Sequence, residues 1–246
     1  MGIAPSWLNM FIEYADQGHV HKGDSILDIG ASELFCSDDP ASLNKFLARF
    51  GAEPYSESEL ARVADRSFAA ELFTRAGFQY TAIDYANFPG VIRLDLNRDE
   101  LPREHHGRHQ FVSNSGTSEH ILNQYNVFKV IHDATALDGV MYHGIPSFGE
   151  YEHGILDYTP KFFWGLAQDN EYEIIRFAGS ADPVQKPLPD EFMKVISFNI
   201  RPITQNVWFH VLLKKRKMQE FKGANDPSFS PDAVDPRAII RGGKVS

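Results

Sequence analysis

The sequence predicts an α/β protein with a doubly wound, mostly parallel sheet and an antiparallel hairpin towards its C-terminus. Short apolar segments typical of buried strands alternate with segments in which apolar residues recur every three or four positions, the period of a helix. Gly30 directly follows the first of these strands, and two apolar segments stand close together between 195 and 213. Such alternation favours parallel strands with helices on both faces of one sheet. The 246 residues, 43% of them hydrophobic, suffice for one such core.

The periodicity places the expected elements in chain order. The first is an amphipathic helix, on which apolar side chains recur at Trp7, Leu8, Phe11 and Tyr14. Strands are expected at 25–29, 78–84, 91–96, 110–113, 140–145, 195–200 and 207–213. Two more helices are expected, one capped by Thr117 or Ser118 and ending at Gly139, and one over 160–170. The last two strands, joined by a turn with Pro202, form the expected hairpin.

Residues 37–76 differ in kind from the strand-rich segments around them. They are polar and helix-prone, and Pro40 and Pro54 interrupt them. We expect them to form a helical insertion after the first strand, in a position to close over a ligand as a lid. Residues 1–222 are expected to form a single domain. Residues 223–246, rich in Gly, Pro, Asp and Ser, are expected to form an extended tail.

Charge and composition argue against several classes of partner. The net charge of −9 disfavours binding to a nucleic-acid backbone, and the basic run from Lys214 to Lys217 is expected to be a solvated strand end. No apolar stretch approaches the roughly 20 residues of a membrane-spanning helix. The only cysteine, Cys36, allows no internal disulfide and favours a reducing compartment. We therefore expect a cytoplasmic protein without nucleic-acid or membrane partners.

The turn after the first strand contains the residues expected closest to a ligand. In an open α/β sheet, ligands bind beyond the carboxyl ends of the strands, near the point where strand order reverses. Gly30 lets the backbone approach a ligand without a Cβ atom in the way. A dinucleotide-binding turn requires two further glycines, and here Ser32 and Phe35 stand at those positions. The sequence therefore disfavours binding of a pyrophosphate at this turn.

The string "ILDIGAS" at 26–32 resembles the first motif of the class I S-adenosylmethionine-dependent methyltransferases. That resemblance extends over about residues 24–215 as an order of elements. It implies a Rossmann-like, seven-stranded sheet with S-adenosylmethionine as the cofactor. It also implies a set of cofactor-binding residues at four strand ends, namely Asp28, Gly30, Ala31, Ser32, Asp84, Asp95 and Asn114.

Each implied position has a role in the family. Asp84 ends the "YTAID" strand, where the family has an acidic residue that binds both ribose hydroxyls; a carboxylate accepts two hydrogen bonds at once. Asp95 matches a position whose side chain contacts the adenine amino group. Asn114 matches a position where the family has a polar residue that faces the methyl donor and the acceptor. Asp84 lies 56 residues after Asp28 (84 − 28), whereas a bare βαβ unit places its acidic residue about 20 residues past the turn. The insertion accounts for the excess.

The methyl acceptor is expected at the segment "HGIPSFGEYEHGILDYTP", from 143 to 160, which contains His143, Glu150 and His153. The pair Glu119-His120 opens the helix after the fourth strand and is expected to face the same cleft. We expect His153 to be the general base, with His120 or His143 as the next candidates. No metal site is predicted, because the remaining histidine group at 105–109 lacks firm ligand spacing.

The leading hypothesis is a methyltransferase that acts on a small-molecule or glycan acceptor, at oxygen or nitrogen. The alternatives are a nicotinamide-dependent oxidoreductase on a related fold and a catalytically silent binding protein with the methyltransferase fold. Ser32 and Phe35 disfavour the oxidoreductase. The apolar N-terminal helix and the long tail are compatible with a homodimer.

Overall fold

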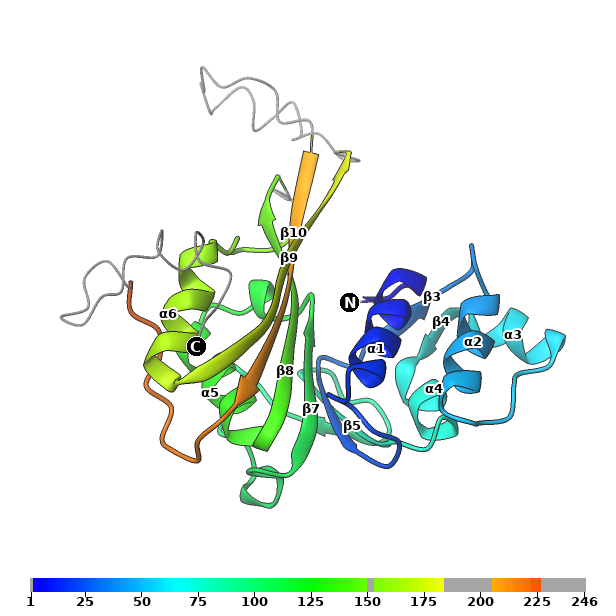
Figure 1. Ribbon diagram of the computed structural model, residues 1–246, viewed down its shortest axis with the longest axis horizontal. Helices are drawn as coiled ribbons and strands as arrows, with labels where there is room; N and C mark the ends of the chain where they lie inside the picture. The colour runs from blue at the N-terminus through cyan, green and yellow to red at the C-terminus, as the bar shows by residue number, and fades with distance from the viewer. Residues whose placement is uncertain (1, 150–152, 184–204, 227–246) are drawn as a thin grey trace.

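A seven-stranded sheet forms the centre of the computed structural model, which describes residues 2–149, 153–183 and 205–226 (Figure 1). In spatial order the strands are β6 (Val91–Arg93), β5 (Gln79–Asp84), β2 (Ser25–Ile29), β7 (His109–Ser115), β8 (Thr135–Phe148), β10 (Gln205–Lys215) and β9 (Tyr172–Pro183). The first five pair in parallel, and β10 is antiparallel to both of its neighbours. Strand order reverses at β2, which confirms the predicted doubly wound sheet with an antiparallel edge.

Helices cover both faces of the sheet (Figure 1). They are α1 (Pro5–Asp16), α2 (Ala41–Arg49), α3 (Glu57–Val63), α4 (Ala69–Arg75), α5 (Gln124–Ala134) and α6 (Pro160–Asn170). The helices α1, α2 and α4 pack on one face, and α5 and α6 pack on the other. Successive strand residues point to opposite faces, so Ile26 and Phe111 belong to the first core, and Leu27 and Val112 to the second. This two-sided burial explains why the central strands are continuous apolar runs.

The N-terminal helix is confirmed, and its apolar side is buried against other parts of the chain. Pro5 occupies its first turn, where a missing N–H costs no hydrogen bond. Phe11 is 1% exposed and its ring contacts those of Trp7 and Phe111. The Trp7 Nε1 donates a hydrogen bond to Ser115 Oγ at 2.9 Å, which ties α1 to the end of β7.

The predicted helical insertion after the first strand contains α2, α3 and α4. A small sheet flanks it, in which β3 (Glu33–Phe35) lies between β1 (Gly2–Ile3) and β4 (Asp65–Phe68). The apolar sides of α2 and α4 are buried in the same core as α1. The Ala69 N–H donates to the Ser32 carbonyl, so the start of α4 is tied to the turn after β2.

The helix expected between Thr117 and Gly139 is shorter than predicted at both ends. Residues Ser118–His120 form a separate 3-10 turn, η2, because the Asn114 side chain accepts the Ser118 N–H and holds this segment against β7. The cap of α5 is Asn123, whose side chain accepts the Asn126 N–H. At the other end α5 stops at Ala134 and β8 begins at once, so Gly139 lies inside a strand. A Cβ atom at Gly139 would lie 3.0 Å from the His109 carbonyl oxygen, so glycine there permits close strand packing.

The predicted antiparallel strands towards the C-terminus are confirmed, but the strand paired with the last one is not the one expected. The expected strand at 207–213 is part of β10, whereas the expected strand at 195–200 lies outside the described residues. The antiparallel partner of β10 on its outer side is β9, a strand that the sequence did not predict. Its second half, with Gly179 and Ser180, has weak strand propensity, and pairing with β10 overrides it. The strand expected at 91–96 is also shorter, since β6 ends at Arg93.

The basic run from Lys214 to Lys217, at the end of β10, is not a solvated strand end throughout. Lys215 is 2% exposed, and its ammonium donates to the carbonyls of His132 and Thr135 at the end of α5. Burial lowers the pKa of Lys215 to about 8. The neighbouring Arg216 and Lys217 form ion pairs with acidic side chains of this chain. Within the described part of the chain, no helix has both the length and the apolarity to cross a bilayer.

Candidate functional site

A cavity of about 500 Å³ opens at the carboxyl ends of β2, β5 and β6. Its walls consist of acidic and apolar side chains and, at the glycine turn, of backbone atoms that no side chain covers. The lining residues are Gly30, Ile83, Asp84, Tyr85, Leu94, Asp95, Leu96, Asn97, Thr117, His120 and Ile121. A volume of this size suits a small-molecule ligand, and its place in the sheet is the expected one for an open α/β fold.

The turn after β2 is held in one shape by the neighbouring strand. Gly30 has φ +90°, a backbone conformation that strongly favours glycine. The Gly30 N–H donates to the Ile83 carbonyl at 2.7 Å, and the Ala31 N–H donates to Asp84 Oδ2 at 2.9 Å. The ends of β2 and β5 are therefore fixed relative to each other, and the predicted residues Gly30, Ala31 and Asp84 meet at one place.

Asp84 and Asp95 present carboxylates to the cavity with acceptor capacity to spare. Asp84 Oδ1 accepts the Ala86 N–H at 2.8 Å, so each of its oxygens holds one backbone donor. A carboxylate has about four lone-pair sites, which leaves room for two further donors at Asp84. Asp95 Oδ1 accepts the Asn97 N–H at 3.0 Å, and Asp95 is partly exposed.

Asp28 and Ser32 lie beneath the turn. Each is 1% exposed. Asp28 Oδ2 accepts the Ser32 N–H at 3.1 Å and the Tyr80 hydroxyl at 2.6 Å. Burial raises the pKa of Asp28 to about 6, against the lowering effect of these hydrogen bonds. Among the described residues, Asp28 Oδ1 and Ser32 Oγ have no hydrogen-bond partner.

Asn114 and His143 form a buried pair behind the cavity. Both are 0% exposed, and Asn114 Nδ2 lies 3.3 Å from His143 Nδ1. Asn114 also exchanges two hydrogen bonds with Ser118, which fixes the start of η2. Burial between Phe128 and Phe163 lowers the pKa of His143 to about 3, so this imidazole is neutral.

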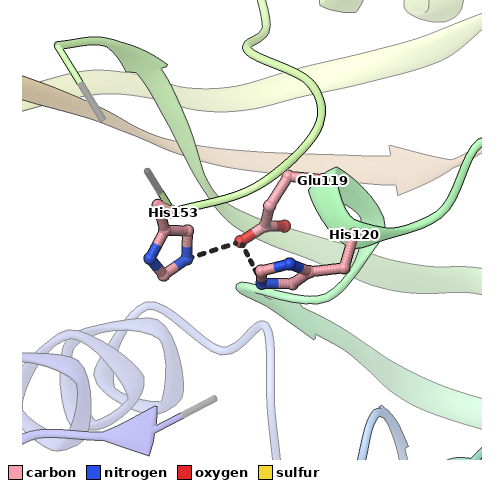
Figure 2. Close-up of side chains that lie close together, drawn as sticks. All are labelled: Glu119, His120 and His153. Carbon is pink, nitrogen blue, oxygen red and sulfur yellow. Dashed lines mark hydrogen bonds and ion pairs between the residues drawn. The ribbon is translucent and has the colours of Figure 1, made fainter. Parts of the chain in front are cut away.

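Glu119, His120 and His153 converge at the edge of the cavity that His120 lines (Figure 2). Glu119 Oε1 lies 3.2 Å from His153 Nε2 and 3.8 Å from His120 Nε2. The Glu119 side chain is 0% exposed, whereas those of His153 and His120 are 36% and 45% exposed. Burial is the main cause of a lowered pKa at His120. A buried carboxylate thus holds two accessible imidazoles side by side.

The loop after β8 is pinned to Glu119 through its backbone. The N–H groups of Ile155 and Leu156 both donate to the Glu119 carbonyl, at 2.9 and 3.2 Å. A Cβ atom at Gly154 would lie 2.8 Å from Glu119 Cγ, so only glycine allows this approach without a shift. The His153 ring also contacts Trp208 of β10, with ring centroids 5.1 Å apart.

The structure thus places the predicted site residues in four groups. Gly30, Asp84, Asp95 and His120 line the cavity, and Asp28, Ala31 and Ser32 lie at or beneath its turn. His153 reaches the cavity edge through Glu119, whereas Asn114 and His143 do not line the cavity. Glu150, named in the acceptor segment, lies outside the described residues.

Sequence reasoning did not identify the central place of Glu119 or the hydroxyl of Tyr80 beside Asp28. The available signal for Glu119 was its position next to His120 in the sequence. Tyr80 carries no comparable signal, because only strand register places it next to Asp28.

No family model matches the chain, and no curated protein does. Among solved structures, the chain is similar to the 1,6-didemethyltoxoflavin-N1-methyltransferase of Burkholderia thailandensis, which was solved with bound 1,6-didemethyltoxoflavin and S-adenosylhomocysteine. The two are 11% identical, with a TM-score of 0.45, and the match covers 85% of this chain and 77% of that one. The YcgJ protein of Bacillus subtilis is 10% identical, with a TM-score of 0.46 over 86% and 98%. An S-adenosylmethionine-dependent methyltransferase of Mesorhizobium loti is 11% identical, with a TM-score of 0.43 over 84% and 99%.

The sheet has the Rossmann-like, seven-stranded arrangement that the sequence resemblance implies, and its antiparallel strand β10 is inserted between β8 and the edge strand β9.

Proposed function

We propose that the protein is an S-adenosylmethionine-dependent methyltransferase that transfers a methyl group to oxygen or nitrogen of a small-molecule or glycan acceptor. The observation that carries the proposal is the meeting of Gly30, Asp84 and Asp95 in one cavity beyond the strand ends. Asp84 can accept both ribose hydroxyls at its remaining lone pairs. The apolar side chains of Leu94 and Leu96 offer a surface for the adenine ring.

Charge separates this proposal from the nicotinamide alternative. S-adenosylmethionine carries a sulfonium and an ammonium, whereas a dinucleotide carries a pyrophosphate. Two carboxylates line the cavity, and the buried Asp28 carboxyl has one unpaired oxygen among the described residues. An acidic site attracts the cation and repels the pyrophosphate. The acidic lining therefore supports S-adenosylmethionine over a dinucleotide.

The acceptor is proposed to lie against Glu119, His120 and His153, at the edge of the same cavity. When bound there, S-adenosylmethionine supplies the methyl group: the acceptor atom loses its proton and bonds to the methyl carbon, and the C–S bond breaks with its electron pair going to sulfur. The chain's own residues hold the reactants in line and exclude water. His153 or His120 can take the acceptor's proton, and His143 is proposed to position Asn114.

The segment from 37 to 76 is proposed to cover the cofactor edge in part. Since α2 and α4 are packed in the core, the part of this segment proposed to do so is β4, which pairs with β3 just before the segment begins. Phe68 of β4 contacts Phe88, in the loop after β5, at a ring-centroid distance of 5.1 Å. A homodimer remains a proposal, and it would use surfaces other than the buried side of α1.

Calorimetry tests the cofactor assignment. We expect one molecule of S-adenosylmethionine, or of its demethylated product, to bind per chain, and NADH not to bind. Absence of binding at millimolar ligand would contradict the proposal. Binding of NADH alone would favour the oxidoreductase. Binding of S-adenosylmethionine without turnover on any acceptor would favour the silent binding protein.

A further inference from the structure

We propose that Glu119, His120 and His153 bind a divalent transition-metal ion such as Zn²⁺ at the acceptor end of the cavity. Each side chain offers one ligand atom, and these three atoms all lie within 4.8 Å of one another. Two imidazoles and one carboxylate, with further positions open, are a set that proteins use for Zn²⁺ and related ions. The inference rests on the proposed function for its role in catalysis, but not for the binding of the ion.

Only small movements of side chains are needed to reach ligand geometry. Ligand bonds of about 2.0–2.1 Å place neighbouring donor atoms roughly 3 Å apart. Glu119 Oε1 is already 3.2 Å from His153 Nε2, and the contact with His120 is 3.8 Å. Both rings are exposed by more than a third, so rotation can bring them together over the buried carboxylate (Figure 2).

The electrostatics of Glu119 favour a cation. Its carboxylate is fully buried, and within the described part of the chain its Oε2 has no hydrogen-bond partner. A buried ionised carboxylate is costly unless a positive charge compensates it. The imidazoles of His120 and His153 both approach Oε1, whereas a bound divalent ion would compensate the carboxylate's charge as a whole.

The surroundings have the features of a built site. The loop that carries His153 donates two backbone hydrogen bonds to the Glu119 carbonyl. Gly154 allows that loop to lie directly on Glu119. Trp208 packs against the His153 ring and orients it. Such outer contacts orient ligands, and their loss commonly costs about 10- to 100-fold in metal affinity.

A metal here specifies the acceptor chemistry. An ion coordinated by a hydroxyl oxygen lowers the pKa of that hydroxyl, so its proton can pass to solvent before methyl transfer. With an ion bound, His120 and His153 act as ligands, and their role as general base applies only to the metal-free site. The site therefore points to an oxygen acceptor, with the heteroatom held by the metal next to the methyl group.

Titration of the metal-free protein with Co²⁺ and Zn²⁺, without S-adenosylmethionine, tests the inference. We expect one ion per chain, with visible Co²⁺ bands of a site with fewer than six ligands, and displacement of Co²⁺ by Zn²⁺. Glu119→Gln, His120→Gln and His153→Gln should each weaken binding by about tenfold or more. Gly154→Ala keeps all three ligands but displaces the loop, and it should weaken binding as well.

The matched control is His21→Gln, which removes a histidine that pairs with Asp24 on the surface and should leave metal affinity unchanged. Circular dichroism of each variant checks the fold. Equal affinity in all cluster variants, or no binding of either ion, would overturn the inference. Binding of Mg²⁺ alone would overturn the metal class. Because S-adenosylmethionine is absent from the titration, failure here leaves the cofactor assignment intact.

Discussion

Replacing Asp84 by alanine is expected to weaken the binding of S-adenosylmethionine by about 1–3 kcal/mol, or roughly 5- to 150-fold. Asp84 ends β5 and faces the cavity. Its two oxygens each hold one backbone N–H, from Ala31 and Ala86, and each can accept one more donor. The alanine variant loses the proposed acceptor of both ribose hydroxyls, and it also loses one of the two hydrogen bonds that tie the glycine turn to β5. Calorimetry on wild type and variant gives the change directly.

Asp24→Ala is the matched control for this change. Asp24 also accepts a backbone N–H, that of His21 at 2.7 Å, but it lies before β2, at the opposite end of the sheet. Both variants therefore lose a carboxylate that supports a turn, but only Asp84→Ala loses a hydrogen-bond acceptor that lines the cavity. We expect Asp24→Ala to bind the cofactor as the wild type does. Equal affinities of wild type and Asp84→Ala would show that the ribose does not lie at the end of β5.

The strand ends were predictable because two local signals coincide there. An apolar run specifies a buried strand, and the first polar residue after it marks the carboxyl edge. In a parallel sheet these edges meet, so Asp28, Asp84 and Asp95 could be placed together before any contact was known. The spacing anomaly between Asp28 and Asp84 was also interpretable, because the intervening helices fold back into the core.

The cluster of Glu119, His120 and His153 depends on contacts that no local pattern encodes. Glu119 and His153 are 34 residues apart, and the backbone hydrogen bonds of Ile155 and Leu156 bring them together. The shortened helix has the same origin, since Asn114 binds the Ser118 N–H across a chain reversal. Tertiary hydrogen bonds here override the capping preference of the sequence, so neither the 3-10 turn nor the three-residue cluster could be derived from periodicity.

The second large effect is expected at Asp28, as a dependence of stability on pH. We expect the free energy of unfolding of the wild type, measured relative to that of Asp28→Asn, to rise as pH falls. The total rise is about 3 kcal/mol, and about half of it occurs between about pH 7 and pH 5. The cause is burial, since Asp28 is 1% exposed and its charged form is poorly solvated. Asparagine has nearly the same size and does not titrate.

The sign follows from the two pKa values. Burial raises the pKa of Asp28 in the folded protein from 3.8 to about 6. Between these values the native state holds a proton that the unfolded state has released, so stability falls as pH rises through this window. Below it, both states are protonated and the relative stability of the wild type is greatest; above it, both are charged and the penalty is constant. Urea unfolding of both proteins over this range measures the difference, and titrations elsewhere cancel.

Tyr80→Phe distinguishes this origin from a general effect of acid. The Tyr80 hydroxyl donates to Asp28 Oδ2 at 2.6 Å and favours the charged carboxylate. Its removal should raise the folded pKa of Asp28 further, so the gain in stability should begin at a higher pH. Bound S-adenosylmethionine should act in the opposite direction. A cation near Asp28 Oδ1, which has no hydrogen-bond partner among the described residues, favours ionisation. The carboxyl ¹³C shift of Asp28, followed with and without ligand, reports both changes. If neither Tyr80→Phe nor the ligand shifts the pKa of Asp28, then Asp28 has a role apart from the cofactor.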